Sequence, residues 1–224
     1  MINVAMDGPV GAGKSSVARE CAKRLGFIYV DTGALYRACG LYCKREGIEI
    51  IPENESRIEA AINGGLTLEI KLLDGVQHVF MNGEDVSGEI RLPEISMAAS
   101  AVSALPAVRR FLLDTQRSVA AENNVIMDGR DIGTVILPNA EVKIFITAKP
   151  EIRAKRRYDE LIAKNTKTTF EEVLSDLMKR DYNDSHRAEA PLKQAEDALL
   201  LDTSELDFEQ TVEKVCEIIN GKTK

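Results

Sequence analysis

Short apolar runs along the chain alternate with segments whose apolar residues recur every three to four positions. The runs have strand length and lie at residues 2–6, 27–30, 125–127, 142–147 and 198–201. The periodic segments predict helices at about residues 14–25, 34–45 and 207–219. Because each short run is apolar throughout, we expect strands that are buried on both faces. The alternation predicts an α/β fold, with a parallel five-stranded sheet flanked by helices.

One stretch, at about residues 63–92, interrupts this alternation. Leu66–Leu72 and Gln77–Met81 are two strand-like runs joined by the turn residues Asp74-Gly75, and Asn82-Gly83 is a second turn signal before Glu84–Val86. We interpret the stretch as a small antiparallel β insert between two helices of the α/β core.

Composition excludes several classes of protein. The 224 residues carry a formal charge of −7, contain no Trp and are only 5% aromatic, which argues against a partner that is a nucleic-acid polymer. No apolar run approaches the roughly 20 residues that span a bilayer. The first residues have no basic segment of a signal peptide. Cys39 and Cys43 have no partners with the spacing of a zinc site. We expect a cytoplasmic protein with reduced cysteines.

A glycine-rich loop follows the first predicted strand and begins the first predicted helix. Its sequence is Gly8-Pro9-Val10-Gly11-Ala12-Gly13-Lys14-Ser15, which matches the phosphate-binding pattern GxxxxGK[ST]. Backbone N–H groups of such a loop surround a phosphate, and the positive end of the helix dipole faces the same place. Lys14 is expected to reach the β- and γ-phosphates of ATP, and the Ser15 hydroxyl is expected to bind Mg²⁺.

A phosphate loop does not by itself define the reaction. A regulatory GTPase would need the base-reading pattern NKxD, which the sequence lacks. The hydrophobic strand ending in Asp-Glu that motor-type ATPases carry is also not found. The interpretation that remains is a kinase for a small molecule, with a non-catalytic P-loop switch protein as the alternative from another class.

Arginines follow two of the predicted strands. Tyr36 and Arg37 lie shortly after the second strand, and Arg130 comes directly after the third. In an open parallel sheet the carboxyl ends of the strands face the ligand crevice. Since arginine binds phosphate in a bidentate manner, these residues are candidates for binding a phosphorylated acceptor.

Residues 149–189 predict a helical lid. Arg153, Arg156 and Arg157 share a helix face by their spacing, and we expect this face to close over the triphosphate. The alternative is an exposed face whose basic residues pair with Asp159 and Glu160.

A second lid helix is expected to begin at the capping box formed by Thr169 and Glu172. Further along it, Arg180, Asp184 and Arg187 recur at i, i+4 and i+7, a spacing that suits either a nucleotide or a ladder of ion pairs within the helix.

Taken together, these motifs resemble those of the bacterial cytidylate kinases, a family of the nucleoside monophosphate kinase group. The resemblance spans almost the whole chain and rests on the phosphate loop with Asp7, on residues 31–37, 83–91, 98–100 and 128–134, and on Arg180-Asp181, Asp184, Arg187-Ala188 and Ala190-Pro191-Leu192. It implies a single kinase domain with a core (1–32, 104–148 and 190–224), a region that binds the monophosphate (about 33–103, including the insert) and a lid (about 149–189). It also implies transfer of the ATP γ-phosphate to CMP or dCMP, with UMP or AMP as alternative acceptors.

The resemblance also implies roles for individual residues. Gly8, Pro9, Val10, Gly11, Ala12, Gly13, Lys14, Ser15 and Ser16 would bind ATP. Relatives vary at the position of Ser16, so the resemblance leaves open whether its hydroxyl contacts the α-phosphate. Arg37, Arg130 and Arg187 look like ligands of the monophosphate, with Thr32 and Tyr36 near the acceptor and Thr32 where many relatives have Ser. Ser100, Arg109 and Asp131 resemble the group that reads cytosine, Asp184 the ribose ligand, and Arg180 a bridge between phosphates. Arg153 and Arg157 match the lid positions near the transferred phosphoryl group, with Arg156 as a third candidate. With no long exposed apolar stripe in the sequence, we expect a monomer.

Overall fold

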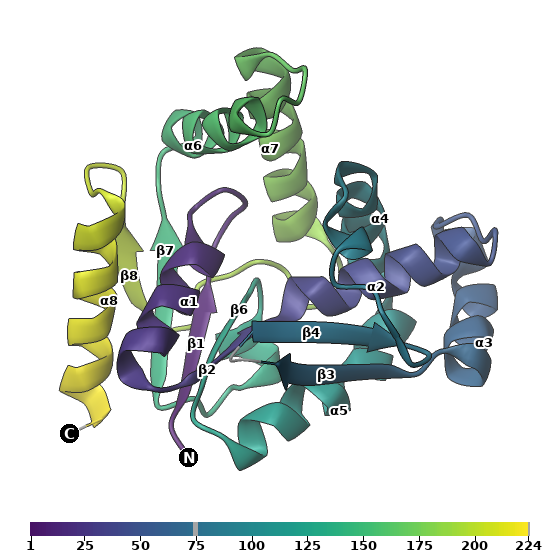
Figure 1. Ribbon diagram of the computed structural model, residues 1–224, viewed down its shortest axis with the longest axis horizontal. Helices are drawn as coiled ribbons and strands as arrows, with labels where there is room; N and C mark the ends of the chain where they lie inside the picture. The colour runs from purple at the N-terminus through teal and green to yellow at the C-terminus, as the bar shows by residue number, and fades with distance from the viewer. Residues whose placement is uncertain (74–75, 224) are drawn as a thin grey trace. The chain divides into compact units, whose positions relative to one another are not determined.

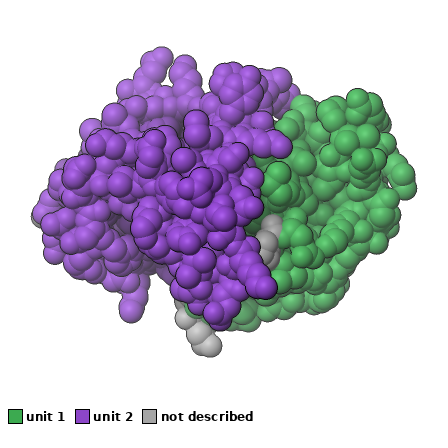
Figure 2. All heavy atoms as spheres, turned by 90° about the horizontal axis from the view of Figure 1, so that it is seen from above, with its two compact units in different colours: residues 1, 28–124 green, residues 2–27, 125–224 purple. Residues whose placement is uncertain are grey.

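The computed structural model describes residues 1–73 and 76–223, so the predicted turn Asp74-Gly75 lies outside the described residues. The chain forms two compact units, coloured separately in Figure 2. Unit 1 contains Met1 and residues 28–124, and unit 2 contains residues 2–27 and 125–224. The finer division into core, monophosphate region and lid remains a prediction.

The larger sheet has five strands in the order β2-β6-β1-β7-β8, which confirms the predicted parallel sheet (Figure 1). Within unit 2, β1 (Asn3–Asp7) lies between β6 (Val125–Gly129) and β7 (Val142–Thr147) and is parallel to both. Strand β8 (Leu199–Asp202) pairs with β7. The fifth strand, β2 (Ile28–Asp31), belongs to unit 1. Residues of β1, β6 and β7 are almost fully buried, because sequence runs that are apolar throughout suit the middle of a covered sheet.

Strand β8 differs from the expectation that every apolar run is buried on both faces. Leu199 and Leu200 are 41% and 59% exposed. The physical reason is position, because β8 is the last strand of the sheet and has a hydrogen-bonded neighbour on one side only.

The helices of unit 2 pack against one another, and α1 and α8 also pack against strands of the sheet. Helix α1 (Lys14–Leu25) packs against α8 (Phe208–Thr223), and α6 (Pro150–Ala163) packs against α7 (Phe170–His186). The predicted capping box of Thr169 and Glu172 is present at the start of α7. After β6 the chain forms a single π-helical turn, η3 (Ile132–Ile136), which the sequence pattern does not predict.

Unit 1 contains the remaining elements: α2 (Thr32–Arg45), α3 (Glu55–Gly65), β3 (Leu68–Leu73), β4 (Val76–Met81), β5 (Glu84–Asp85), α4 (Pro93–Ser103) and α5 (Pro106–Glu122), with the short turns η1 (Pro52–Asn54) and η2 (Glu89–Arg91). The three strands form an antiparallel sheet in the order β3-β4-β5, which confirms the predicted β insert. Leu35, Leu41, Ile58, Ile62 and Leu112 are fully buried and form the centre of this unit's core. Among the described residues, no helix is long and apolar enough to cross a membrane.

Candidate active site

The phosphate loop lies between β1 and α1, as the sequence predicts. Its first glycine, Gly8, has no room for a side chain, because a Cβ there would collide with the carbonyl oxygen of Ile146 on β7. Gly13 has a φ of 84° and forms the N-terminal cap of α1 in the left-handed conformation, which a residue with a Cβ adopts at a cost. These glycines therefore bring the backbone close to β7 and turn it directly into the N-terminus of the helix.

Lys14 is buried at the start of α1, and its Nζ donates a hydrogen bond of 2.7 Å to the carbonyl oxygen of Pro9. Burial, and then the positive charge of Arg130, lower the pKa of the Lys14 ammonium to about 7. Asp128, Asp7 and Asp184 act in the opposite direction. The loop thus contains an ammonium group that titrates near neutral pH when no phosphate is bound.

Ser15 donates a hydrogen bond of 2.8 Å from Oγ to Oδ2 of Asp128. Asp128 lies near the carboxyl end of β6, the strand next to β1. A hydroxyl beside a carboxylate is a set of hard oxygen donors, the kind that Mg²⁺ prefers. The role of Asp128 was not assigned from the sequence, although a carboxylate at the end of a predicted parallel strand was the available signal.

Asp7 is a second buried carboxylate with no role assigned from the sequence. Its Oδ1 and Oδ2 accept hydrogen bonds of 2.8 Å each from the N–H groups of Ile132 and Gly133. Burial raises the pKa of Asp7 to about 6, although both N–H groups favour its charged form. Asp7 therefore connects the end of β1 to the first turn of η3, directly after Asp131.

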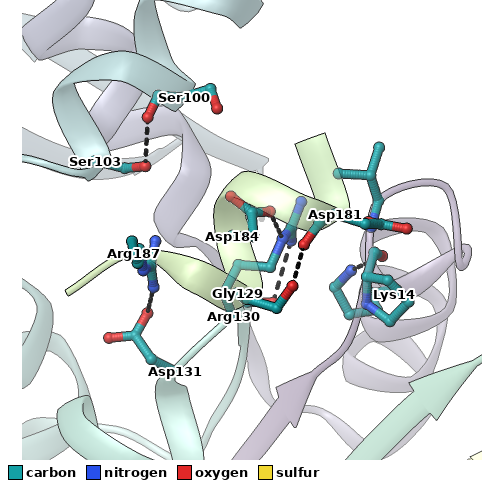
Figure 3. A network of polar contacts seen from close by, with 12 residues as sticks. Lys14, Ser100, Ser103, Gly129, Arg130, Asp131, Asp181, Asp184 and Arg187 are labelled. Atoms are coloured by element: carbon teal, nitrogen blue, oxygen red, sulfur yellow. Dashed lines mark hydrogen bonds and ion pairs between the residues drawn. The ribbon is translucent and has the colours of Figure 1, made fainter. Parts of the chain in front are cut away.

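Two arginine–carboxylate pairs connect the end of β6 to the end of α7 (Figure 3). Arg130 Nε donates to Asp184 Oδ2 at 2.8 Å, and Arg187 Nη2 donates to Asp131 Oδ1 at 3.1 Å. The side chains of Arg187 and Asp131 are only 5% and 4% exposed. Asp184 thus pairs with an arginine outside α7, the one that follows β6. The structure brings these four predicted site residues together in unit 2. Arg180, another predicted site residue, is half-buried on α7.

The three lid arginines do not share one set of partners. Arg153 is buried and donates to the carbonyl oxygens of Ala148 and Val10, and its Nη1 lies 2.5 Å from Asp181 Oδ2. Asp181 Oδ1 accepts the N–H of Val10 at 3.0 Å. Arg153 is therefore in direct contact with the phosphate loop, and Asp181 is a further contact residue that sequence reasoning missed.

The other lid arginines point elsewhere. Arg156 donates to the carbonyl oxygens of Thr203 and Leu206, in the connection between β8 and α8. Arg157 pairs with Glu160 on the exposed side of α6, where Lys155 also pairs with Asp159. The three arginines lie close together along α6, yet their side chains contact three different places: the phosphate loop, the β8–α8 connection and the exposed surface.

Unit 1 holds a separate group of predicted site residues. Arg109 is buried, donates to the carbonyl oxygen of Ser103 at 3.2 Å, and lies 5.6 Å from the ring centroid of Tyr36. Ser103 Oγ in turn donates to the carbonyl oxygen of Ser100. Ser100, Arg109 and Tyr36 are thus connected within unit 1, whereas Asp131, the third member of the predicted cytosine-reading group, belongs to unit 2.

The monophosphate candidate of unit 1 is Arg37, on α2. It donates to Ser96 Oγ at 3.0 Å, and Thr32 is buried at the start of the same helix. Ser96 on α4 was not singled out from the sequence. That the residues of units 1 and 2 converge on one nucleotide remains a prediction.

Comparisons with known proteins agree with this arrangement. The sequence model of the cytidylate kinase family matches residues 4–221. The chain belongs to the cytidylate kinase family. It is 51% identical over 224 residues to the cytidylate kinase of Caldanaerobacter subterraneus subsp. tengcongensis, with 100% of this chain and 96% of that protein covered. It is 48% identical over 217 residues to the cytidylate kinase of Caldicellulosiruptor bescii, with 97% and 95% covered.

One solved structure supports the fold. An uncharacterized protein from Eubacterium ventriosum aligns with a TM-score of 0.52 at 11% identity, covering 98% of this chain and 99% of that one. At this identity the likeness concerns the fold alone.

The titration of Lys14 gives a testable property of this family member. Above a pKa of about 7 the free enzyme holds neutral Lys14, whereas bound triphosphate favours the ammonium. MgATP affinity is therefore expected to fall as the pH rises from 7 to 9, by up to about tenfold per pH unit. Calorimetry at pH 8 in buffers of different ionisation enthalpy should show uptake of nearly one proton.

Lys143→Gln provides the matched control, because Lys143 is also buried in unit 2 but pairs with Asp197. This variant should take up the same number of protons on MgATP binding as the parent. Affinity that is constant from pH 7 to 9, with no proton uptake, would contradict the assignment to Lys14.

Proposed function

We propose that this chain transfers the γ-phosphoryl group of MgATP to CMP or dCMP, giving ADP and CDP or dCDP. It is an ATP-dependent nucleoside monophosphate kinase, and the proposal concerns its acceptor and its residues. The observation that carries the proposal is the match of the cytidylate kinase family over residues 4–221. The buried arginine–carboxylate pairs of unit 2 supply groups of the kind that a nucleotide acceptor needs.

On the donor side, residues 8–16 would bind the ATP phosphates, with Lys14 at the β- and γ-phosphates. Ser15 and Asp128 would hold Mg²⁺, directly or through its water ligands. Mg²⁺ would neutralise charge on the phosphates and orient them. Arg153 would stabilise the charge of the transferring phosphoryl group, and Arg157 would reach it from the lid.

On the acceptor side, Arg37, Arg130 and Arg187 would bind the monophosphate, with Thr32 and Tyr36 nearby and Arg180 between the phosphates. Asp184 would bind the ribose. Ser100, Arg109 and Asp131 would read the cytosine edge. The cytosine amino group is a hydrogen-bond donor, whereas uracil has an acceptor there, so a buried carboxylate distinguishes the two bases.

The transfer needs positioning and charge more than acid–base chemistry. A phosphoryl group moving in line between two oxygens is stabilised mainly by cations and oriented donors. Lys14 and Arg153, both buried in contact with the phosphate loop, are such groups. His186, by contrast, is exposed and stacked on Tyr182, 4.0 Å between ring centroids, and is not needed as a base. We propose direct transfer without a covalent enzyme intermediate.

A coupled assay of ADP release tests this function. The enzyme should release ADP with CMP and dCMP and much more slowly with UMP and AMP. Faster ADP release with UMP or AMP would assign another acceptor. ADP release that does not depend on any of the four acceptors would indicate a P-loop protein without acceptor chemistry.

The partners of the chain follow from the same proposal. They are small nucleotides, not a nucleic-acid polymer or a membrane, and the enzyme would act in the cytoplasm. The monomeric state expected from the sequence is tested by light scattering on the full chain in the presence and absence of CMP.

A further inference from the structure

One buried amide of the β insert contacts the end of β2, directly before the acceptor helix of the same unit. Gln77 lies on β4 and is buried. Its Oε1 accepts the backbone N–H of Asp31 at 2.7 Å, and its Nε2 donates to the carbonyl oxygen of the same residue at 3.1 Å. A side-chain amide that exchanges both bonds with one residue imitates the peptide of a neighbouring strand. The insert thus extends the hydrogen bonding of β2 at its last residue.

Asp31 is the point at which β2 becomes α2. Its side chain caps the helix, accepting the N–H of Ala34 at 3.1 Å. Thr32 begins the helix, and Arg37 follows within two turns. Because a helix is stiff over this length, fixing the backbone of Asp31 fixes the direction in which α2 starts and hence the place of the Arg37 guanidinium.

Gln77 is itself held firmly. Strand β4 lies between β3 and β5, and Val79 and Met81 on the same strand are buried in the core of unit 1. The N–H of Val79 also donates to Ser87 Oγ at 2.9 Å. The packing of β4 therefore fixes the position of the Gln77 amide. The amide in turn fixes the backbone at the start of α2.

We propose that Gln77 is a positioning residue for the acceptor, through which the β insert orients α2 and its Arg37 toward the phosphate of the nucleoside monophosphate. The inference rests on the proposed function, because it takes Arg37 to be a phosphate ligand. It gives the insert a role in acceptor affinity, separate from donor binding in unit 2.

The test is the variant Gln77→Leu, which keeps much of the side chain's volume and removes both hydrogen bonds. We expect the Kd and KM for CMP to rise about tenfold, in line with two lost hydrogen bonds. The Kd for MgATP and the kcat at saturating CMP should stay near the parent values. Because the effect concerns the phosphate ligand, UMP as a poor acceptor should lose affinity by the same factor.

A double-mutant cycle with Arg37→Met separates positioning from general loss of structure. If Gln77 acts through Arg37, Gln77→Leu should have little further effect on CMP affinity once Arg37 is replaced. Glu69→Gln is the matched control in the same insert, because Glu69 is exposed on β3 and pairs with Lys71 at the surface. It should leave both affinities unchanged.

Three outcomes would overturn the inference: a CMP Kd within twofold of the parent, equal losses of CMP and MgATP affinity, or additive effects in the cycle. If Gln77→Leu does not fold, Gln77→Glu keeps an acceptor for the Asp31 N–H, replaces the donor by an oxygen and adds a negative charge, and the same cycle is measured with it. The two proposals can fail separately. If the parent phosphorylates CMP and the variant keeps the parent's CMP affinity, the role of Gln77 is wrong and the proposed function still stands.

Discussion

Replacing Arg153 with Met is expected to lower kcat by about 10³-fold, the lower end of what an arginine at the transferring phosphoryl group contributes in related chemistry. The KM for CMP should change little, because the interaction is made with the transition state and not with the bound acceptor. Arg153 is the lid arginine that contacts the phosphate loop, through the carbonyl oxygen of Val10 at 2.7 Å. For this reason we expect a larger loss than from Arg157→Met, whose parent residue pairs with Glu160 at the surface.

The contacts of Arg153 also dictate how the experiment must be controlled. Removing the guanidinium leaves Asp181 without the ion pair that the structure gives it, and a carboxylate left without its partner in a partly buried place destabilises the fold. The variant Asp181→Asn keeps the acceptor for the Val10 N–H and removes the charge. We therefore expect Arg153→Met combined with Asp181→Asn to be more stable than Arg153→Met alone, yet equally slow.

The measurements are kcat, KM for both substrates, and the free energy of unfolding in denaturant. Lys155→Met is the matched control, because Lys155 lies on the same helix and pairs with Asp159 at the exposed surface. Its kcat should equal that of the parent. A kcat for Arg153→Met within tenfold of the parent, with a folded protein, would remove Arg153 from the transfer step.

The fold could be predicted where the pattern of residues is local. Runs that are apolar throughout, such as residues 142–147, mark strands of a covered parallel sheet, and the structure has β7 at those residues. The capping box at Thr169 and the helix at Lys14 depend on neighbouring residues only, and both are confirmed. The exposure of Leu200 could not be predicted in this way, because it depends on β8 being the last strand of the sheet.

The site could be predicted less completely, because side-chain spacing does not determine a partner. Arg153 and Arg156 are three residues apart on one helix, yet one contacts the phosphate loop and the other the β8–α8 connection. The deciding partners are backbone carbonyls of segments far away in the sequence, that of Val10 for Arg153 and that of Thr203 for Arg156. Asp7 and Gln77 are further examples, since both bind backbone groups and neither bond leaves a signature in the local sequence.

The second large effect concerns the choice of base. Replacing Asp131 with Ala is expected to reduce the preference for CMP over UMP by at least about 100-fold in kcat/KM, because a site built on hydrogen bonds rejects the wrong base by about 10⁴–10⁵. In the parent we propose that the carboxylate accepts from the cytosine amino group and repels the uracil carbonyl. The structure shows that Asp131 is almost fully buried, where such a charge interacts most strongly.

The ion pair of Asp131 with Arg187 adds a second consequence. The side chain of Arg187 is equally buried, so Asp131→Ala removes its ion pair at 3.1 Å and should also destabilise the protein, by about 3–5 kcal/mol. Asp131→Asn keeps the volume and one hydrogen-bonding oxygen. It should be the more stable variant while still losing selectivity, because its amide can donate to the uracil carbonyl.

Asp184→Asn is the matched control for this comparison. It removes the carboxylate that pairs with Arg130 near the end of α7. We propose this carboxylate, that of Asp184, as the ribose ligand. Because CMP and UMP carry the same ribose, this variant should lower kcat/KM for both and leave their ratio unchanged. Selectivity lost in Asp131→Asn and kept in Asp184→Asn would assign base reading to Asp131 alone. Relative rates for CMP and UMP that are the same in the Asp131 variants as in the parent would transfer that role to Ser100 and Arg109 of unit 1, which are linked there through Ser103.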